Sequence, residues 1–412
     1  MIPRGWSLLK VADFLERVSI PVILNEGETY REIGIRSHGK GIFHKELTDA
    51  VKIGNKRVFE IVKNAFIVNI VFAWEQAVAK TSNNEIGFIA SHRFPQFLPK
   101  NNLCNIDFLL YFFKTPKGKY LLGLASPGGA GRNKTLGQKE FEKLELVLPP
   151  IMEQHKITKI LSTWDKEIRT TEALIDNSKQ QKKALMQQLL TGKKRFSGFK
   201  GEWEEVKLSS LASPLSKKSF TDGDWVESPY ISDSGCRLIQ TGNIGVGVFK
   251  DKNKKYISEQ SFIDLKCTEV QVGDLLICRL AEPAGRACVV PEINEKKMLT
   301  SVDVTIMKVD STRTTSHFLS FIFSLDHTLY TVSSLCGGST RSRVSRTNLG
   351  SMKIKLPSIK EQHKISSVLT CAYKEIELLE QQLADLKQEK KALMQQLLTG
   401  KRRVKVDESE AA

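Results

Sequence analysis

A run of twelve residues occurs twice in this chain without a single change. The run "KKALMQQLLTGK" begins at Lys182 and again at Lys390, 208 positions later. Neighbouring segments repeat at the same offset, so that "EQHKI" at 153–157 returns at 361–365 and "LVLPPIMEQ" pairs with "IKLPSIKEQ". The segment starts also correspond, "GWSLLKVADF" with "EWEEVKLSSL", at an offset of 197. The chain therefore contains an internal repeat of one structural unit, and the second copy is about eleven residues longer in its middle.

The middle parts of the two units do not match. The stretch "IGIRSHGKGIFHKE" of the first unit has no counterpart in "YISDSGCRLIQTGNIGVG" of the second. A repeated frame that carries two diverged inserts suggests one task performed on two different targets.

The repeated segments predict two long helices. Residues 153–190 and 361–398 contain neither Gly nor Pro and are rich in strong helix formers. Their apolar residues recur at alternating steps of four and three over five heptads, which is typical of a coiled coil. Pro149, Pro150 and Pro357 precede the helices, and Gly192 and Gly400 follow them.

The two helices are expected to pack on each other in antiparallel orientation. Only about ten residues separate Gly192 from the start of the second unit at Trp203, so the second helix must run back towards the first. The alternative is two separate homodimeric coils. We predict an α+β fold, with two mixed α/β domains joined by two long antiparallel coiled-coil helices and related by a pseudo-twofold axis. The predicted domains are residues 1–149 and residues 193–357, and the second of these ranges includes a linker. The predicted helices are residues 150–192 and 358–400, and residues 401–412 form a basic-then-acidic tail without fixed structure.

The net charge indicates a polyanionic partner. The chain has 62 Lys and Arg against 46 Asp and Glu, which gives +16 and a pI near 9.4. Nucleic acid is the first expectation, and a merely soluble basic protein is the alternative. No signal peptide and no apolar run of membrane-spanning length are evident, so we expect a cytoplasmic protein without a membrane partner. Seven scattered cysteines without a C-x-x-C pair, and His155 and His363 without a second ligand nearby, predict reduced thiols and no metal site.

Basic and amide side chains in the Gly-containing loops are the candidate DNA contacts. Lys and Arg bind phosphates, and Arg, Asn and Gln also read base edges. For any one of them the alternative is a solvated basic loop. The candidates are Arg36, Lys40, Lys56, Arg57, Arg93, Arg132, Lys134, Gln240, Asn243, Lys254, Lys255, Arg279, Arg286, Arg341, Arg343 and Arg346.

Catalytic motifs do not stand out. The stretch "GGAGRNKT" at 128–135 fails the phosphate-loop pattern because Asn133 replaces the required Gly before Lys134. No G-x-S-x-G or H-E-x-x-H motif is present either. We interpret the chain as a binding protein, and a nucleotide-hydrolysing enzyme built on residues 128–135 is a competing hypothesis that an ATPase assay would test.

The two variable domains, each followed by "LP…EQ.KI" and a helix that ends in "KKALMQQLLTGK", resemble the specificity (S) subunit of type I restriction–modification systems. The resemblance covers nearly the whole chain. It implies a non-catalytic subunit in which each domain recognises one half of a split double-stranded DNA site and the helices set the spacer. It further implies two methylation (M) subunits that bind S-adenosylmethionine and two motor–nuclease (R) subunits that use ATP and magnesium, with no cofactor bound by this chain.

By this resemblance, the identical runs are docking surfaces for two identical partners. The expected docking residues are Leu185, Met186, Leu189, Leu393, Met394 and Leu397. Their alternative role is the core of the coil, and the two roles are compatible because Met186 and Met394 lie off the apolar seam. A coiled-coil scaffold whose basic inserts bind other proteins is the competing function.

Overall fold

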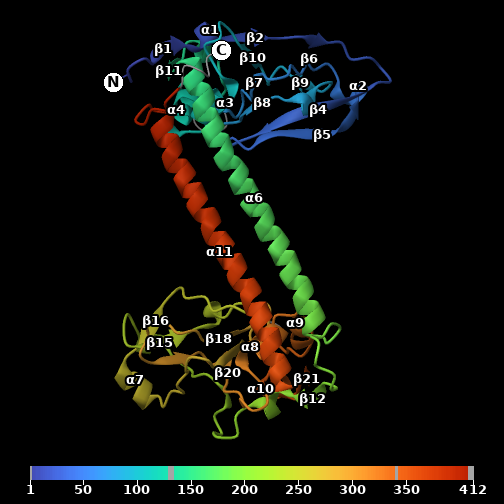
Figure 1. Ribbon diagram of the computed structural model, residues 1–412, viewed down its shortest axis with the longest axis vertical. Helices are drawn as coiled ribbons and strands as arrows, with labels where there is room; N and C mark the ends of the chain where they lie inside the picture. Colours follow the sequence, from blue (N-terminus) through green and yellow to red (C-terminus); the bar gives the residue numbers. More distant parts are fainter. Residues whose placement is uncertain (1, 129–133, 339–341, 407–412) are drawn as a thin grey trace. The chain divides into compact units, whose positions relative to one another are not determined.

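The computed structural model describes residues 2–128, 134–338 and 342–406. It divides into two compact units, Met1–Glu172 with Gln381–Ala412, and Ala173–Glu380. The long helices α6 (Ile151–Leu189) and α11 (Ile359–Leu397) have 39 residues each and contribute to both units (Figure 1). The helices predicted over 153–190 and 361–398 are therefore confirmed, each starting two residues earlier and ending one residue earlier than predicted.

The first unit combines sheets with short helices. Its strands are β1 Ser7–Lys10, β2 Leu15–Val18, β3 Pro21–Val22, β4 Thr29–Arg36, β5 Gly41–Asp49, β6 Val58–Glu60, β7 Phe66–Val68, β8 Val78–Lys80, β9 Ile89–Ser91, β10 Gln96–Pro99 and β11 Glu145–Leu148. Its shorter helices are α1 Val11–Phe14, α2 Ala50–Ile53, α3 Ile106–Phe113, α4 Pro116–Leu124, α5 Gln138–Glu142, and the 3-10 turns η1 Ala73–Glu75 and η2 Asn83–Glu85. The strands pair in the orders β1–β11, β2–β10–β7–β8 and β3–β6–β9–β4–β5.

The second unit has the same kinds of elements. Its strands are β12 Glu204–Lys207, β13 Phe220–Asp222, β14 Ile231–Ser232, β15 Cys236–Ile239, β16 Lys255–Ile257, β17 Leu275–Cys278, β18 Ala287–Val289, β19 Met298–Thr300, β20 Val304–Met307 and β21 Lys353–Leu356. Its shorter helices are α7 Glu259–Asp264, α8 Ser316–Ile322, α9 Asp326–Ser334, α10 Arg346–Ser351, and the 3-10 turns η4 Leu208–Leu211, η5 Ser228–Tyr230 and η6 Thr241–Asn243. The strands pair in the orders β12–β21, β13–β20–β17–β18 and β14–β16–β15–β19.

The frame of the two units is the same and their inserts differ. Each unit has one two-stranded sheet, one four-stranded sheet and a pair of helices, α3–α4 or α8–α9, that begin with a side-chain cap at Asn105 or Thr315. The remaining sheet is five-stranded in the first unit and four-stranded in the second, with a different strand order. The sequence difference between the two middles is thus a difference in this third sheet.

Each core receives the start of one long helix and the end of the other. In the first unit, Ile157 and Leu161 of α6 and Leu397 of α11 pack with Phe113 and Phe141. In the second unit, Ile365 and Leu369 of α11 and Met186 and Leu189 of α6 pack with Phe318 and its neighbours. Burial of this apolar surface is the main force that holds the helices to the sheets.

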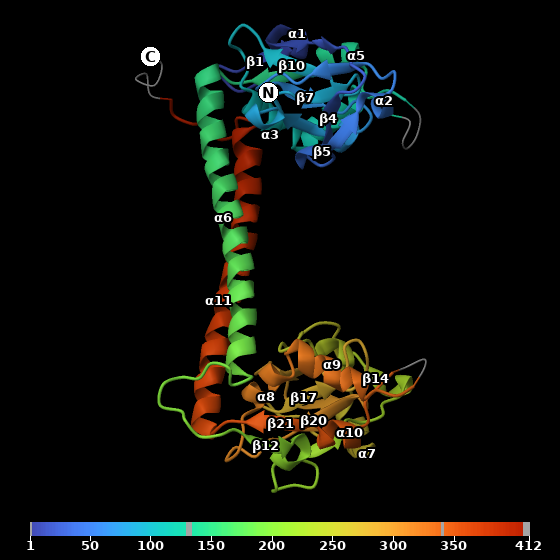
Figure 2. The same cartoon turned by 90° about the vertical axis from the view of Figure 1, so that its right-hand side faces the viewer.

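The long helices run antiparallel where they meet within each unit (Figure 2). In the first unit Lys390 contacts Asp165 at 2.5 Å and Lys387 contacts Glu172 at 2.7 Å. Residue numbers therefore increase along α6 in the direction in which they decrease along α11. In the second unit Lys179 contacts Glu380 at 2.7 Å. These pairs lie beside the apolar seam, as expected for an antiparallel coiled coil.

One lysine of the repeated run has different surroundings in the two units. Lys390 binds Asp165, whose other oxygen accepts a hydrogen bond from Tyr111 at 2.6 Å. Burial opposes ionisation of Asp165, but these two hydrogen bonds prevail and lower its pKa. The equivalent Lys182 lies 3.8 Å from the centre of the Tyr373 ring, and Tyr373 occupies the position of Asp165. Burial, with Lys179 nearby, lowers the pKa of Lys182.

The repeated "EQHKI" motif places a buried glutamine at the start of each long helix. Gln154 and Gln362 are both fully buried. The Gln154 amide donates to the carbonyl oxygens of Leu103 and Pro149, and its Oε1 accepts the N–H of Asn105 at the start of α3. The Gln362 amide likewise donates to the carbonyl oxygens of Arg313 and Pro357, and its Oε1 accepts the N–H of Thr315 at the start of α8. The motif therefore fixes the helix start to the domain, which explains its repetition.

The adjacent glutamate of this motif binds an arginine that follows the end of the other long helix. Arg195 contacts both carboxylate oxygens of Glu361, and Arg403 contacts both oxygens of Glu153. Gly192 and Gly400, at φ 71° and 70°, end the preceding helices in the left-handed conformation that favours glycine. Among the described residues, no helix combines the length and the apolar character needed to cross a bilayer.

Candidate nucleic-acid interface

Predicted DNA contacts gather around a hollow in the second unit. This second-unit hollow has a volume of about 570 Å³. Arg279, Arg343 and Arg346 line it together with Asp222. Arg343 and Arg346 are exposed, and their guanidinium groups lie 3.1 Å from Asp303 and 4.0 Å from Asp222. Two exposed cations held by carboxylates at the mouth of a hollow suit a phosphate group, which would compete for the same hydrogen bonds.

A second hollow, in the first unit, collects another pair of the predicted contacts. This first-unit hollow, of about 300 Å³, is lined by Lys56, Arg93 and Lys45. The half-exposed Lys45 reaches the nearly buried carboxylate of Glu32 at 3.3 Å. The other lining residues are Asn69, Val71, Phe72, Ser91, His92 and Phe94. The combination of surface cations with a buried acid and an amide provides both phosphate-binding groups and groups able to read a base edge.

The remaining basic candidates lie at the surface outside both hollows. Arg36, Lys40, Arg57, Lys254 and Lys255 are exposed. Gln240 is half-buried, and the half-buried Lys134 lies 5.9 Å from the centre of the Trp74 ring. Arg132 and Arg341 lie outside the described residues.

Three of the predicted DNA contacts have hydrogen-bond partners within the fold. Asn243 is 2% exposed and donates to the carbonyl oxygens of Lys250 and Lys252 at 2.8 and 2.7 Å. The side chain of Arg286 donates to four backbone carbonyls, those of Thr241, Ile244, Leu280 and Pro283. Arg279 is 5% exposed and donates to the carbonyls of Val302 and Val344. Their polar groups stabilise the fold, because buried donors need acceptors.

The predicted docking residues are part of the chain's own cores. Met186, Leu189 and Leu397 are buried. Leu185, Leu393 and Met394 are half-buried and pack against the same cores. The side chain of Met186 thus faces the second unit's core rather than a partner. Within the long helices, the exposed residues of the two identical runs are Lys183, Ala184, Gln187 and Gln188 in α6 and Lys391, Ala392, Gln395 and Gln396 in α11, which we call the repeated face.

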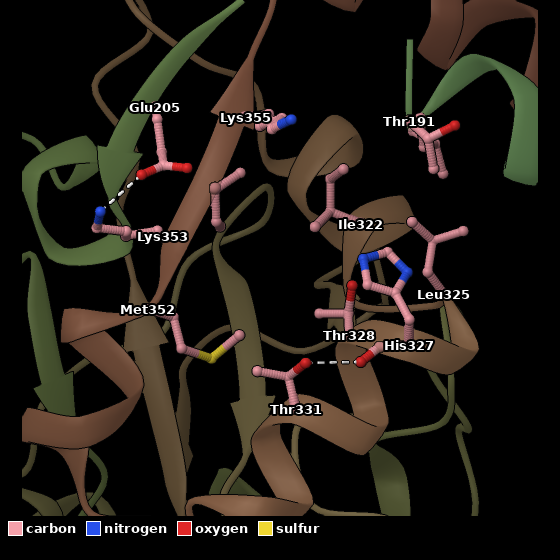
Figure 3. A pocket seen from close by; sticks show the side chains of 12 residues that line it. Thr191, Glu205, Ile322, Leu325, His327, Thr328, Thr331, Met352, Lys353 and Lys355 are labelled. Atoms are coloured by element: carbon pink, nitrogen blue, oxygen red, sulfur yellow. Dashed lines mark hydrogen bonds and ion pairs between the residues drawn. The ribbon is translucent and has the colours of Figure 1, made fainter. Parts of the chain in front are cut away.

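A further hollow lies beside the end of α6 in the second unit (Figure 3). Its volume is about 360 Å³. Ile322, Leu325 and Met352 provide its apolar lining, and Glu205 pairs with Lys353 at 2.7 Å at one edge. Thr191, three positions beyond the last residue of the repeated face in α6, also borders this hollow.

Sequence reasoning missed one charged residue of the second unit. Arg237 is fully buried in β15, and its Nε and Nη1 atoms have no hydrogen-bond partner within the part of the chain that the structure describes. The signal was available, since Arg237 interrupts the apolar run "CRLI" of a buried strand. Among residues 2–128, 134–338 and 342–406, no group of three or more His, Cys, Asp or Glu is arranged to hold a metal ion.

Comparison with known proteins identifies relatives of the whole chain. The type I restriction enzyme MjaVIII specificity subunit from Methanocaldococcus jannaschii is 26% identical over 422 residues, which cover 98% of this chain and 94% of the relative. The putative type I restriction enzyme MjaX specificity subunit of the same organism is 25% identical over 442 residues, which cover 98% and 95%.

Solved structures share the fold at low sequence identity. The HsdS subunit from Thermoanaerobacter tengcongensis matches with a TM-score of 0.56 and 15% identity over 97% of this chain and 98% of that one. The type I restriction–modification S subunit from M. genitalium matches with a TM-score of 0.57 and 12% identity over 99% and 100%.

The family model described as the type I restriction modification DNA specificity domain matches this chain twice, at residues 25–178 and 200–388. Each match contains one diverged insert and a large part of the long helix that follows it. The resemblance drawn from the doubled helix motif is therefore confirmed, and the chain belongs to the family of type I restriction–modification specificity subunits.

Proposed function

We propose that each unit recognises one half of a bipartite double-stranded DNA site. The observation that carries this proposal is the repeated frame with two different third sheets, because two recognition surfaces on one kind of scaffold suit two different short sequences. The double match of the specificity-domain model supports the same division. The long helices, which continue from one unit into the other, would then set the number of unspecified bases between the halves.

DNA contacts in this proposal centre on the two hollows. Arg343 and Arg346 in the second unit, and Lys56 and Arg93 in the first, supply exposed cations for backbone phosphates. Sequence discrimination requires groups that meet base edges, and the Glu32 carboxylate and Asn69 amide are candidates in the first-unit hollow.

The repeated face is the proposed docking surface for two methylation subunits. Its residues are exposed and identical in both copies, although the helix stretches before it, 167–181 and 375–389, have diverged at most positions. Lys183 pairs with Asp326 at 2.9 Å. That contact does not account for the identity of the exposed alanines and glutamines, whereas two copies of one partner would require the same surface twice. The apolar hollow next to the end of α6 offers a place for an additional partner side chain (Figure 3).

S-adenosylmethionine, ATP and magnesium belong to partner subunits in this proposal, together with two motor–nuclease subunits that complete the restriction complex. The chain itself contributes recognition and assembly.

Co-expression with a methylation subunit of the same system, followed by sequencing of adenine methylation across the host genome, tests the function. Methylation at one split motif with two short specified halves is the expected result. A complex that methylates a continuous motif would refute the bipartite assignment. Failure of the two proteins to associate would favour the alternative of a scaffold whose basic inserts bind other proteins.

A further inference from the structure

A strongly basic loop connects two neighbouring strands of the third sheet in the second unit. Residues 250–255, which we call the basic loop, contain four lysines and one aspartate, and all six residues are exposed. The loop enters β16, which pairs with β15 in antiparallel register. An exposed loop of this composition would be expected to be mobile unless other groups hold its backbone.

Asn243 holds the backbone of the basic loop from inside the unit. Its side-chain amide donates to the carbonyl oxygens of Lys250 and Lys252, and its Oδ1 accepts the N–H of Gln240 at 2.9 Å. The carbonyl oxygen of Asn243 also accepts the N–H of Lys250 at 2.8 Å. One buried residue thus makes three hydrogen bonds to the first half of the loop.

The turn that carries Asn243 is itself held by a half-buried guanidinium. Arg286 donates to the carbonyl oxygens of Thr241 and Ile244, the residues on either side of the Gly242–Asn243 pair, at 3.2 and 2.9 Å. The position of Asn243 is therefore determined by the core of the unit and not by the loop.

Arg237 adds a second contact with the loop from below. Its Nη2 lies 3.2 Å from the Asp251 carboxylate and 3.5 Å from the carbonyl oxygen of Lys252. Asp251 in turn binds Lys254 at 3.2 Å. Two nitrogen atoms of this fully buried arginine have no hydrogen-bond partner among the described residues, and leaving buried donors unsatisfied is costly to the fold. A role of this contact in binding, rather than in stability, would explain why an arginine occupies position 237.

We propose that the basic loop contacts backbone phosphates of DNA and that Asn243 and Arg237 are positioning residues that fix the loop backbone before DNA binds. This inference rests on the proposed DNA-binding function and adds Lys250 and Lys252 to the predicted Lys254 and Lys255. A loop that is already ordered loses less conformational entropy on binding, so its lysines contribute more affinity than the same charges on a mobile segment. The predicted base contact of Asn243 is replaced by this indirect role.

The first experiment asks whether the loop meets DNA. Binding of the full chain to a fluorescein-labelled duplex of 40 base pairs is measured by anisotropy over a series of salt concentrations. The magnitude of the slope of log K against log salt falls by about 0.9 when one phosphate–cation pair is removed. The variant K250A/K252A/K254A/K255A should lower this slope by about 1.8 or more, which corresponds to at least two such pairs.

A matched variant removes four exposed lysines from the long helices, K159A/K166A/K360A/K374A, and changes the net charge equally. Its slope should stay within about 0.9 of the wild type. Equal slopes for the two quadruple variants would overturn the proposal. A wild-type chain that shows no salt-dependent binding would instead refute the proposed DNA-binding function.

The second experiment separates positioning from general folding. Asn243→Asp keeps the shape of the side chain and the bond from Gln240 but removes both donors to the loop. Asn253→Asp adds the same charge within the loop, at an exposed residue with φ 48°, and leaves the Asn243 bonds intact. We expect the Asn243 variant to lower the salt slope as the four-lysine variant does and the Asn253 variant to lower it by less than half as much.

Amide hydrogen exchange of the full chain provides the readout that is independent of DNA. In the Asn243 variant, exchange should accelerate at 250–255 while β15 and β17 stay protected. Equal DNA affinity, slope and loop exchange in the two variants would overturn the positioning role. If the Asn243 variant does not fold, Arg237→Lys, which retains the charge and shortens the reach to Asp251, is measured in the same way with the same expected and contrary results.

Discussion

Arg403 and Glu153 form a two-point contact across 250 residues of sequence. The Arg403 Nε and Nη2 atoms lie 2.7 and 2.6 Å from the two carboxylate oxygens, and Nη1 donates to the carbonyl oxygen of Arg4. Glu153 is 2% exposed and also accepts the indole N–H of Trp6 at 3.2 Å. The segment after α11 therefore binds the start of α6 and the start of the chain within the first unit.

Replacing Arg403 should destabilise the first unit. Arg403→Ala leaves the buried carboxylate with the Trp6 hydrogen bond as its one remaining side-chain contact among the described residues, and we expect a loss of about 1–2 kcal/mol, limited because the Arg403 side chain is itself 41% exposed. Denaturant unfolding followed by Trp fluorescence measures the change. Arg402→Ala is the control, since the Arg402 side chain is exposed and should change stability by less than about 0.5 kcal/mol. Equal effects of the two substitutions would contradict the structural role of the pair.

The Asp165–Lys390 pair predicts a pH dependence confined to acid. The folded-state pKa of Asp165 is lowered from its usual 3.8, so ionised Asp165 stabilises the fold above that pH and this contribution is lost as the pH falls through the lowered value. Asp165→Asn should therefore reduce the thermal midpoint at pH 7, and the difference from wild type should shrink below about pH 3.8. Asp49→Asn, at an exposed site, is the control. A difference that is constant down to the acid transition would argue against this linkage.

The arginines of the second-unit hollow should bind phosphates. The double variant R343A/R346A is expected to lower the salt slope of duplex binding by about 1.8, because two phosphate–cation pairs are removed. Arg313→Ala is a matched control in the same unit, because Arg313 is bound to Ser210 and Glu204 away from the hollow. Anisotropy titrations as a function of salt give both values. An unchanged slope in the double variant would remove this hollow from the DNA interface.

Bulky residues on the repeated face should prevent docking one site at a time. Ala184→Trp and Ala392→Trp each place a large ring on one copy of the face without entering a core. Native mass spectrometry of co-expressed complexes should show one methylation subunit fewer for each single variant and none for the double variant. Ala173→Trp, at an exposed site of α6 outside the repeated run, is the control. Retention of both subunits in the double variant would exclude this surface.

The frame of the fold was predictable because its signals are local. Helix-forming composition, the four-three spacing of apolar residues, and Gly192 and Gly400 all act within a few residues of where they stand. Strand order in the third sheets was not predictable, because β15 pairs with β19 through a contact between residues about sixty positions apart. Packing partners at that distance leave no periodic trace in the sequence.

The candidate site was predicted by residue type, which does not reveal where a side chain points. Arg343 and Asn243 were equally plausible DNA contacts in the sequence. The fold exposes Arg343 at a hollow, but it buries Asn243 against two carbonyl oxygens. Similarly, Met186 lies off the apolar seam and was predicted to contact a docking partner, with a core role as the alternative, and the structure buries it in the core of the second unit. Both outcomes depend on the tertiary structure, which determines which side chains are covered and which backbone groups need a partner.

The segments after the two long helices make equivalent contacts, but they differ in whether the residues in contact belong to one continuous peptide. In the second unit, Arg195 binds Glu361 of α11 and the carbonyl oxygen of Gly201, and Arg195 and Gly201 belong to the one continuous peptide that leads from α6 into β12. In the first unit, Arg403 and Arg4 reproduce this corner from the two opposite ends of the chain. Hydrogen bonds of Arg403 in the first unit therefore correspond to contacts that Arg195 makes within a continuous peptide in the second unit. Proteolytic removal of Arg4 or Arg403 would break this corner of the first unit, whereas the equivalent corner of the second unit is held by the continuous peptide as well.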